Sequence, residues 1–139
     1  MAYVSLDSEQ IKRANKKHKY TKEQVEQLEK CMDEKTGPLF FMKTFMKIQH
    51  PTKGELPFDP YPYQERLIEA YNNHRFSVSM LPRQTGKTTC ASGYIIWYAM
   101  FKPDSQILIA AHKYAGASDI MSRVRYAYEM LPAFIKAGV

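Results

Sequence analysis

The chain has 139 residues, 45% of them hydrophobic and 24% charged, which is the composition of an ordinary globular protein with room for one modest domain. The formal net charge of +6 weakly favours a polyanionic partner. The sequence shows no secretory signal and no apolar run long enough to span a membrane, so we expect a protein of a reducing, cytosolic setting.

Cysteine and histidine positions give no metal-binding pattern. Cys31 and Cys90 are far apart and lack the spacing of metal ligands, so we expect both to be small core residues. The four histidines form no metal motif either.

The first part of the chain, residues 1–60, is predicted to be a basic arm followed by helices. Residues 1–20 are polar and basic, and both a solvated arm and a nucleic-acid contact fit them. Residues 21–60 are predicted as a helical lead-in with a possible hairpin. Thr21 and Gln24 have capping-box spacing for a first helix, and Pro38 can open a second. The first helix is expected to bury an apolar face of Val25, Leu28 and Met32, and the hairpin is expected over residues 48–58.

The second part, residues 61–139, has the order of elements that is typical of a parallel sheet. A helix over 63–71 is followed by a strand over 76–81, in which apolar and small polar residues alternate. An apolar helix over 89–100 leads to a continuous apolar strand over 106–111 and a helix over 114–130. This β-α-β-α order predicts the start of a doubly wound α/β sheet.

The loop between the first of these strands and its helix carries the chemistry. Gly86, Lys87 and Thr88 form the ending of a phosphate-binding P-loop, although Leu81 occupies the position of the usual first glycine. Backbone N–H groups at a helix N-terminus attract phosphates, Lys87 supplies a positive charge, and the Thr88 hydroxyl suits Mg²⁺. The alternative is a tight strand-to-helix turn that leaves a lysine exposed.

Several stretches resemble the large terminase subunits of tailed bacteriophages, in the branch related to T-even phages. Residues 83–89 resemble the ATP-binding loop of that family, and residues 61–64 its adenine-recognition segment. Residues 107–113 resemble its second strand, and residues 130–134 a recurrent pattern after a helix; the helical lead-in over 11–31 agrees as well. The implied fold is a RecA-like P-loop NTPase, with residues 61–139 as the first half of its ATPase domain.

The resemblance also implies roles for single residues. Arg83 and Lys87 are the catalytic candidates, with Arg83 sensing the γ-phosphate, and Thr88 is the Mg²⁺ ligand. Tyr63 and Gln64 match the two residues that recognise adenine in the family, which we call the adenine pair. Alternatives stay open: a capped, half-buried helix start for Tyr63 and Gln64, and a phosphate clamp or a surface salt bridge for Arg83. The full set of expected ATP-binding residues is Tyr63, Gln64, Arg83, Gln84, Thr85, Gly86, Lys87, Thr88 and Thr89.

The family implies an ATP- and Mg²⁺-dependent ATPase that moves double-stranded DNA into a procapsid. Its implied partners are the portal protein, the small terminase subunit and further copies in a ring, with no membrane, in the host cytoplasm at the procapsid portal. The family's Asp-Glu strand and nuclease residues have no counterpart here, so we expect an N-terminal piece of a longer protein that is inactive alone. A fragment of a superfamily-two helicase-like DNA-dependent ATPase and a non-catalytic nucleotide-binding phage protein are the alternatives.

Overall fold

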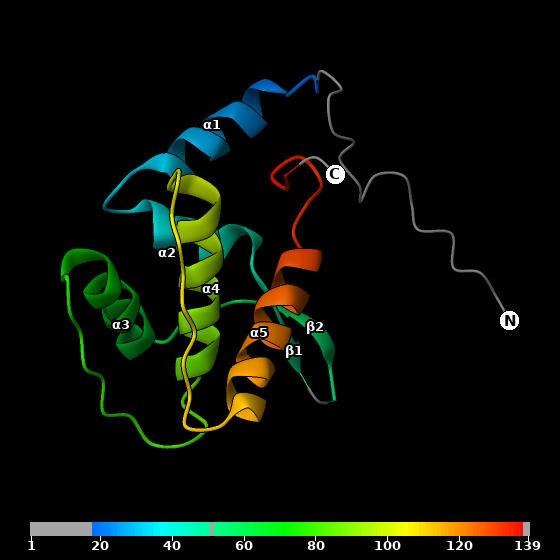
Figure 1. Ribbon diagram of the computed structural model, residues 1–139. Helices are drawn as coiled ribbons and strands as arrows, with labels where there is room; N and C mark the ends of the chain where they lie inside the picture. Colours follow the sequence, from blue (N-terminus) through cyan, green and yellow to red (C-terminus); the bar gives the residue numbers. More distant parts are fainter. Residues whose placement is uncertain (1–17, 51, 138–139) are drawn as a thin grey trace, which may run out of the picture.

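The computed structural model describes residues 18–50 and 52–137, which form an α/β structure of five helices and one β-hairpin (Figure 1). The predicted basic arm lies outside the described residues as far as residue 17, and the division of the chain near residues 20 and 60 stays a prediction. In chain order the elements are α1 (Lys22–Met32), α2 (Gly37–Phe45), β1 (Lys47–His50), β2 (Gly54–Pro57), α3 (Pro62–Asn73), α4 (Lys87–Phe101) and α5 (Tyr114–Glu129).

The helix starts follow the local signals in the sequence. Thr21 caps α1 through a capping box: the Gln24 N–H donates to Thr21 Oγ1 over 3.3 Å, and the Thr21 N–H donates to Gln24 Oε1 over 3.1 Å. Pro38 lies in the first turn of α2, as predicted. The predicted apolar face of α1 is wrong in part, because Met32 is 65% exposed and Val25 is exposed too. Instead, α1 places Cys31 in the core, close to the turn into α2.

The core surrounds α4 and draws residues from every helix. Gly93 of α4 allows close packing against α2, because a Cβ atom there would collide with the side chains of Met42 and Met46. Both cysteines are buried, as predicted, and burial raises the pKa of Cys31 to about 12 and that of Cys90 to about 11. The largest fully buried side chains include Trp97, Phe41, Met42 and Ile68.

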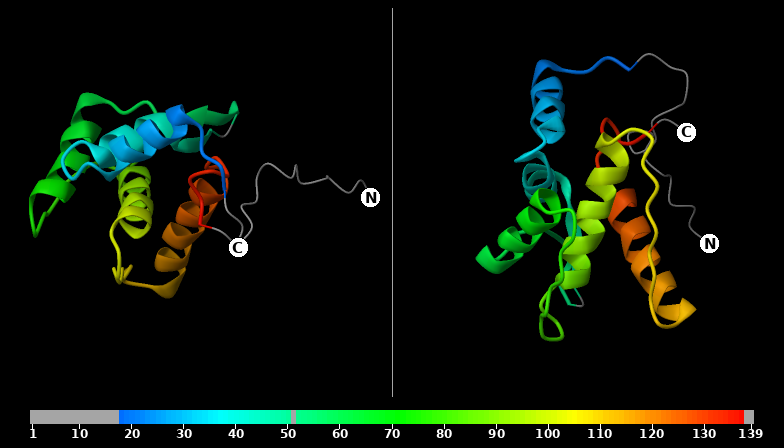
Figure 2. Two further views of the ribbon diagram at one scale, coloured as in Figure 1. Left: turned by 90° about the horizontal axis from the view of Figure 1, so that it is seen from above. Right: turned by 60° about the vertical axis from the view of Figure 1, so that its left-hand side comes forward.

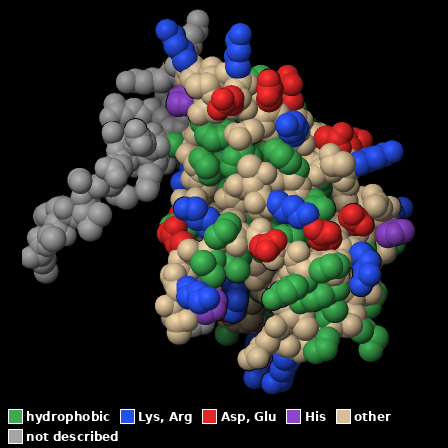
Figure 3. All heavy atoms as spheres, turned by 180° about the vertical axis from the view of Figure 1, so that it is seen from behind, with side chains coloured by type: hydrophobic (Ala, Val, Ile, Leu, Met, Phe, Trp, Pro, Cys, Tyr) green, Lys and Arg blue, Asp and Glu red, His purple; other side chains and the backbone are tan. Residues whose placement is uncertain are grey.

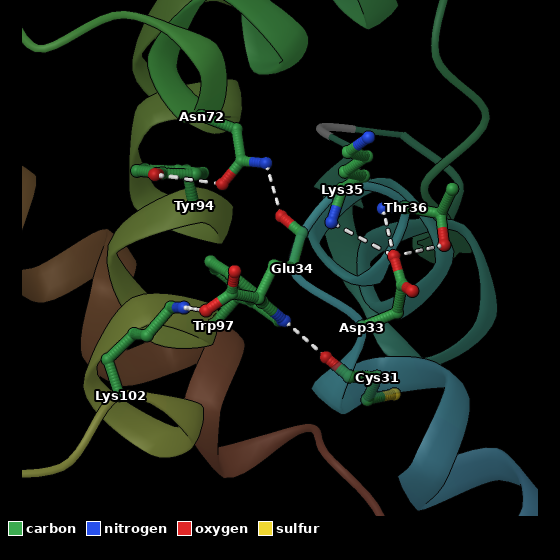
Figure 4. Close-up of polar contacts among 9 residues, drawn as sticks. All are labelled: Cys31, Asp33, Glu34, Lys35, Thr36, Asn72, Tyr94, Trp97 and Lys102. Atoms are coloured by element: carbon green, nitrogen blue, oxygen red, sulfur yellow. Dashed lines mark hydrogen bonds and ion pairs between the residues drawn. The ribbon is translucent and has the colours of Figure 1, made fainter.

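Polar contacts join the connection between α1 and α2 to α3 and α4 (Figure 4). The Trp97 Nε1–H donates to the main-chain oxygen of Cys31 over 2.8 Å within the core. The Asn72 side chain donates to the Glu34 main-chain oxygen over 2.5 Å, and Lys102 pairs with the Glu34 carboxylate over 3.0 Å. The bonds of Trp97 and Lys102 hold the C-terminal half of α4 against the connection between α1 and α2.

The hairpin predicted over residues 48–58 is confirmed. Strands β1 and β2 pair antiparallel, with Lys47 opposite Pro57 and His50 opposite Gly54. Gly54 has a φ of 71°, a left-handed conformation that glycine adopts without steric cost. The resulting two-stranded sheet is the only sheet in the part of the chain that the structure describes.

The two strands predicted for a parallel sheet, residues 76–81 and 106–111, are not strands in the structure. The first segment leads from α3 round to α4, and the second runs back from α4 toward α5 (Figure 2). Most of their apolar side chains face solvent, with Val78 94%, Met80 95% and Leu108 91% exposed. A strand needs a neighbour for its backbone hydrogen bonds, and no described strand lies beside either segment.

On the face of the molecule seen from behind, charged side chains are not gathered into a patch of one sign. Figure 3 shows acidic and basic side chains interspersed on that face. Lys43 pairs with Glu65, Lys47 with Glu55 over 3.2 Å, and Arg123 with Asp119 over 3.2 Å. None of the described helices is long and apolar enough to cross a membrane.

Candidate functional site

The loop that precedes α4 makes a tight turn, and two of its residues have a left-handed backbone conformation. Gly86 has a φ of 73° and is the N-cap residue of α4, and Gln84 also lies in the left-handed region with a φ of 61°. A Cβ atom at position 86 would collide with the Gln64 side-chain nitrogen. Glycine is therefore favoured here by its backbone conformation, and any larger residue would also displace the end of the Gln64 side chain.

The N-terminus of α4 has no side-chain cap. Its first bond runs from the Cys90 N–H to the Gly86 oxygen over 2.9 Å, so the N–H groups of the residues before Cys90 have no partner within the helix. The positive end of the helix dipole lies at the same place. Two cations, Arg83 and Lys87, and no acidic residue occur between Pro82 and Thr89. The arrangement is suited to an anion.

Side-chain bonds hold the loop closed. Thr85 Oγ1–H donates to the Pro82 oxygen over 3.0 Å, and Lys87 Nζ donates to the Leu81 oxygen over 3.3 Å. The Lys87 amine therefore lies against the loop rather than extending away from it.

The predicted pair Tyr63 and Gln64 contacts the loop directly. Tyr63 Oη–H donates to the Thr85 main-chain oxygen over 2.9 Å, and Gln64 Nε2–H donates to the same oxygen over 3.1 Å. Gln64 Oε1 accepts from the Tyr61 N–H over 2.9 Å, which caps the start of α3. Gln64 is buried, and the Tyr63 ring stacks on that of Tyr61 with centroids 5.9 Å apart.

The other predicted residues lie around this centre. Arg83 and Gln84 are exposed, and Arg83 forms no hydrogen bond or ion pair with the described residues. Thr88 is half-buried in the first turn of α4. Thr89 is directed elsewhere, into a pocket that it shares with β1 and α5. The structure thus brings Tyr63, Gln64, Thr85 and Gly86 into contact and leaves Arg83 free.

Sequence reasoning did not give the hydrogen bonds from Tyr63 and Gln64 to Thr85. It did leave open a capped, half-buried helix start for the pair, and Gln64 does cap α3, three residues after Tyr61. No cluster of three or more potential metal ligands occurs among the described residues. Thr88 therefore remains the one predicted Mg²⁺ ligand of the loop.

The structure is an α/β protein in which the uncapped N-terminus of α4 is suited to an anion. Residues 78–138 match the family described as the N-terminal part of terminase large subunits of the T4likevirus type. This range, which includes the loop, α4 and α5, is similar to that family. The match confirms the resemblance inferred from the loop and indicates a role in bacteriophage DNA packaging. Tyr63 and Gln64 precede the matched range.

Proposed function

We propose that the loop before α4 is a P-loop that binds ATP with Mg²⁺ as part of a DNA-packaging motor. The observation that carries the proposal is the uncapped N-terminus of α4 behind the left-handed Gly86, in a segment that matches the terminase family. Exposed N–H groups and two cations without a neighbouring acid favour a polyphosphate over a neutral ligand.

The residues of the loop fit the groups of a nucleotide triphosphate. Lys87 would place its charge at the β- and γ-phosphates, and the Thr88 hydroxyl would bind Mg²⁺, which neutralises phosphate charge when it is bound. Arg83 is free to turn toward the γ-phosphate, where its planar, permanently charged fork would stabilise charge that develops during phosphoryl transfer. The backbone N–H groups at the start of α4 would hold the phosphates in place.

Gln64 retains the hydrogen-bonding groups that adenine needs. A carboxamide has two donor hydrogens and two acceptor lone pairs, and its bonds to Thr85 and Tyr61 use one of each. One donor and one acceptor remain, and together they match the N7 and the N6 amine of adenine. Tyr63 would lie against the base. The adenine pair would thus read the base and support the phosphate loop at once.

The parallel sheet of a P-loop ATPase is part of the same proposal. Segments 76–81 and 106–111 keep the apolar patterns of strands, and they would pair once other strands lie beside them. In that state the motor would use ATP hydrolysis to drive double-stranded DNA into a procapsid. Its partners would be the portal protein, the small terminase subunit and further copies in a ring, at the procapsid portal in the host cytoplasm.

Nucleotide binding by the 139-residue chain tests the proposal. Titration calorimetry should detect ATP binding that requires Mg²⁺, and Lys87→Ala should weaken it at least tenfold. Lys53→Ala is the matched control, because Lys53 is an exposed lysine of the hairpin, away from the loop. If both substitutions weaken ATP binding equally, the effect comes from net charge and the assignment is refuted. Unchanged ATP binding in Lys87→Ala would refute it too.

A further inference from the structure

Tyr63 reaches the loop before α4 through its hydroxyl rather than through the face of its ring. Tyr63 Oη–H donates to the Thr85 main-chain oxygen over 2.9 Å, and Gln64 Nε2–H donates to the same oxygen over 3.1 Å. Two side-chain donors from the first turn of α3 therefore meet on one carbonyl group of the loop. A carbonyl oxygen has two lone pairs, so the two bonds together fix the direction of this C=O group.

The direction of the Thr85 carbonyl determines the direction of the next N–H group. No described peptide bond is cis, and in a planar trans peptide the C=O and N–H bonds point in opposite directions. Because the Thr85 oxygen faces α3, the Gly86 N–H points away from α3. This N–H forms no main-chain hydrogen bond within the described residues. It therefore joins the unpartnered N–H groups in the first turn of α4.

The ring of Tyr63 is held at its edge and on one face. Its hydroxyl bonds the loop, and its ring stacks on that of Tyr61, with centroids 5.9 Å apart and planes 6° apart. Tyr63 is half-buried, whereas Tyr61 is 66% exposed. A ring held in this way has little freedom to turn, which keeps the hydroxyl directed at Thr85.

An anion at the loop would strengthen the bond from Tyr63. Hydrogen bonds on the two ends of one peptide group polarise each other, because a peptide N–H that donates to a phosphate makes the carbonyl of the same peptide a better acceptor. The bond between Tyr63 and Thr85 is therefore stronger when the Gly86 N–H has an anionic partner. An interaction that is stronger in the bound state contributes to affinity, and not only to the stability of the fold.

We infer that Tyr63 is a positioning residue whose hydroxyl aims the Gly86 N–H at the phosphate groups of the bound nucleotide. The inference rests on the proposed ATP site and adds a role that does not depend on the base. The other face of the ring remains available to the base, so the ring and the hydroxyl of Tyr63 have separate roles. Loss of the hydroxyl should weaken every ligand that carries the same phosphate groups.

Tyr63→Phe tests the inference, because it removes the hydroxyl and keeps the ring. Titration calorimetry of the 139-residue chain with Mg²⁺ compares ATP, GTP and inorganic tripolyphosphate, which has no base. The substitution should weaken all three by the same factor, about fivefold, which is about 1 kcal/mol. The preference for ATP over GTP should stay as in the wild type. Gln64 still donates to the Thr85 oxygen in this variant, so the contact between α3 and the loop is kept.

Tyr94→Phe is the matched control. The Tyr94 hydroxyl donates to the Tyr71 main-chain oxygen over 3.3 Å or to Asn72 Oδ1 over 3.4 Å, at the opposite end of α3 from the loop. Its removal should lower stability in urea unfolding and leave the affinities for all three probes unchanged. A second measurement follows the Gly86 amide signal of the ¹⁵N-labelled wild-type chain, which should shift when tripolyphosphate and Mg²⁺ are added.

The possible failures can be told apart. Unchanged tripolyphosphate affinity in Tyr63→Phe would overturn the inference, while the ATP site itself would still stand. Equal weakening by Tyr94→Phe would overturn it too, because the effect would then come from a general loss of stability. A Gly86 signal that does not move with tripolyphosphate would show that this N–H does not face the phosphates. If the wild type binds neither ATP nor tripolyphosphate, the proposed function fails and the inference fails with it.

Discussion

Gln64 Nε2 donates a hydrogen bond to the main-chain oxygen of Thr85 across 3.1 Å, and this bond joins the first turn of α3 to the loop before α4. The same side chain caps α3 by accepting from the Tyr61 N–H. A single buried carboxamide therefore fixes the helix start and the loop relative to each other. Any change at Gln64 is expected to act on both.

Replacing Gln64 by glutamate separates its two contacts. Glutamate keeps the acceptor for the Tyr61 N–H, but it cannot donate to Thr85 and places a carboxylate against that carbonyl oxygen. We expect Gln64→Glu to lower the free energy of unfolding by about 1–3 kcal/mol. Urea unfolding followed by circular dichroism measures this. The control is Gln106→Glu, which makes the same charge change at an exposed position and should have little effect. Equal stabilities of the two variants would show that the Thr85 bond contributes nothing.

The same residue is expected to decide the choice of base. The free donor and acceptor of Gln64 pair with the adenine edge, whereas guanine presents an oxygen acceptor in place of the amine. The chain should therefore prefer ATP to GTP, and Gln64→Ala should reduce that preference. Competition binding with the two nucleotides measures the ratio. An unchanged ratio in Gln64→Ala would remove Gln64 from base selection and leave it as a support for the loop.

Arg83 is expected to act on the reaction rather than on binding. It is exposed and forms no ion pair with the described residues, so its substitution should leave the folded loop intact. In a form of the protein that hydrolyses ATP, Arg83→Ala should lower kcat by roughly 10³-fold with little change in ATP affinity. Arg83→Lys keeps the charge but loses the planar fork, and it should recover only part of the rate. A large loss of affinity with kcat intact would identify Arg83 as a phosphate clamp.

Because the two thiols are buried, the free energy of unfolding is expected to change with pH in the alkaline range. The pKa of Cys31 is raised to about 12 and that of Cys90 to about 11, whereas an unfolded thiol titrates near about 8.5. Their contribution to the free energy of unfolding is complete below the unfolded pKa. Above about pH 8.5 the unfolded state loses these protons first, so stability falls as the pH rises toward 11.

Urea unfolding at pH 7 and pH 10 measures this fall. The double variant Cys31→Ala, Cys90→Ala should fall less between the two pH values than the wild type does, although it starts from a lower stability because small cavities remain. Burial also raises the pKa values of Tyr71 and Tyr94, and this contribution is present in both proteins. The charge on Cys90 raises the pKa of Tyr71 further, and that part is lost together with the thiol. Identical falls would show that the thiols do not contribute.

Local signals in the sequence predicted the helices and the hairpin well. The capping box at Thr21, the proline at Pro38 and the glycine at Gly54 each act within a few residues, so their effect is readable from the chain alone. The strands predicted over 76–81 and 106–111 do not form in the structure, and local signals could not decide this. The apolar pattern is local, but the hydrogen bonds of a strand come from a neighbour, and the described chain provides none.

The candidate site was predicted by residue type but not by its contacts. The loop motif identified Gly86, Lys87 and Thr88, because phosphate binding needs those residues at that spacing. The bond between Gln64 and Thr85 spans 21 positions, and it follows from the packing of α3 beside α4.

The chain is expected to bind ATP without hydrolysing it at the rate of a motor. No Asp or Glu follows either apolar segment, at residues 82–83 or 112–113, so the loop lacks a carboxylate to activate water or to support Mg²⁺ from a second side. Phosphate release from residues 1–139 should therefore stay far below about 1 s⁻¹, the lower end of ordinary enzyme rates. Lys87→Ala is the control for background hydrolysis. A rate of phosphate release that this variant shares with the wild type does not come from the loop. Magnesium-dependent turnover near 1 s⁻¹ that Lys87→Ala abolishes would show that the chain supplies its own general base.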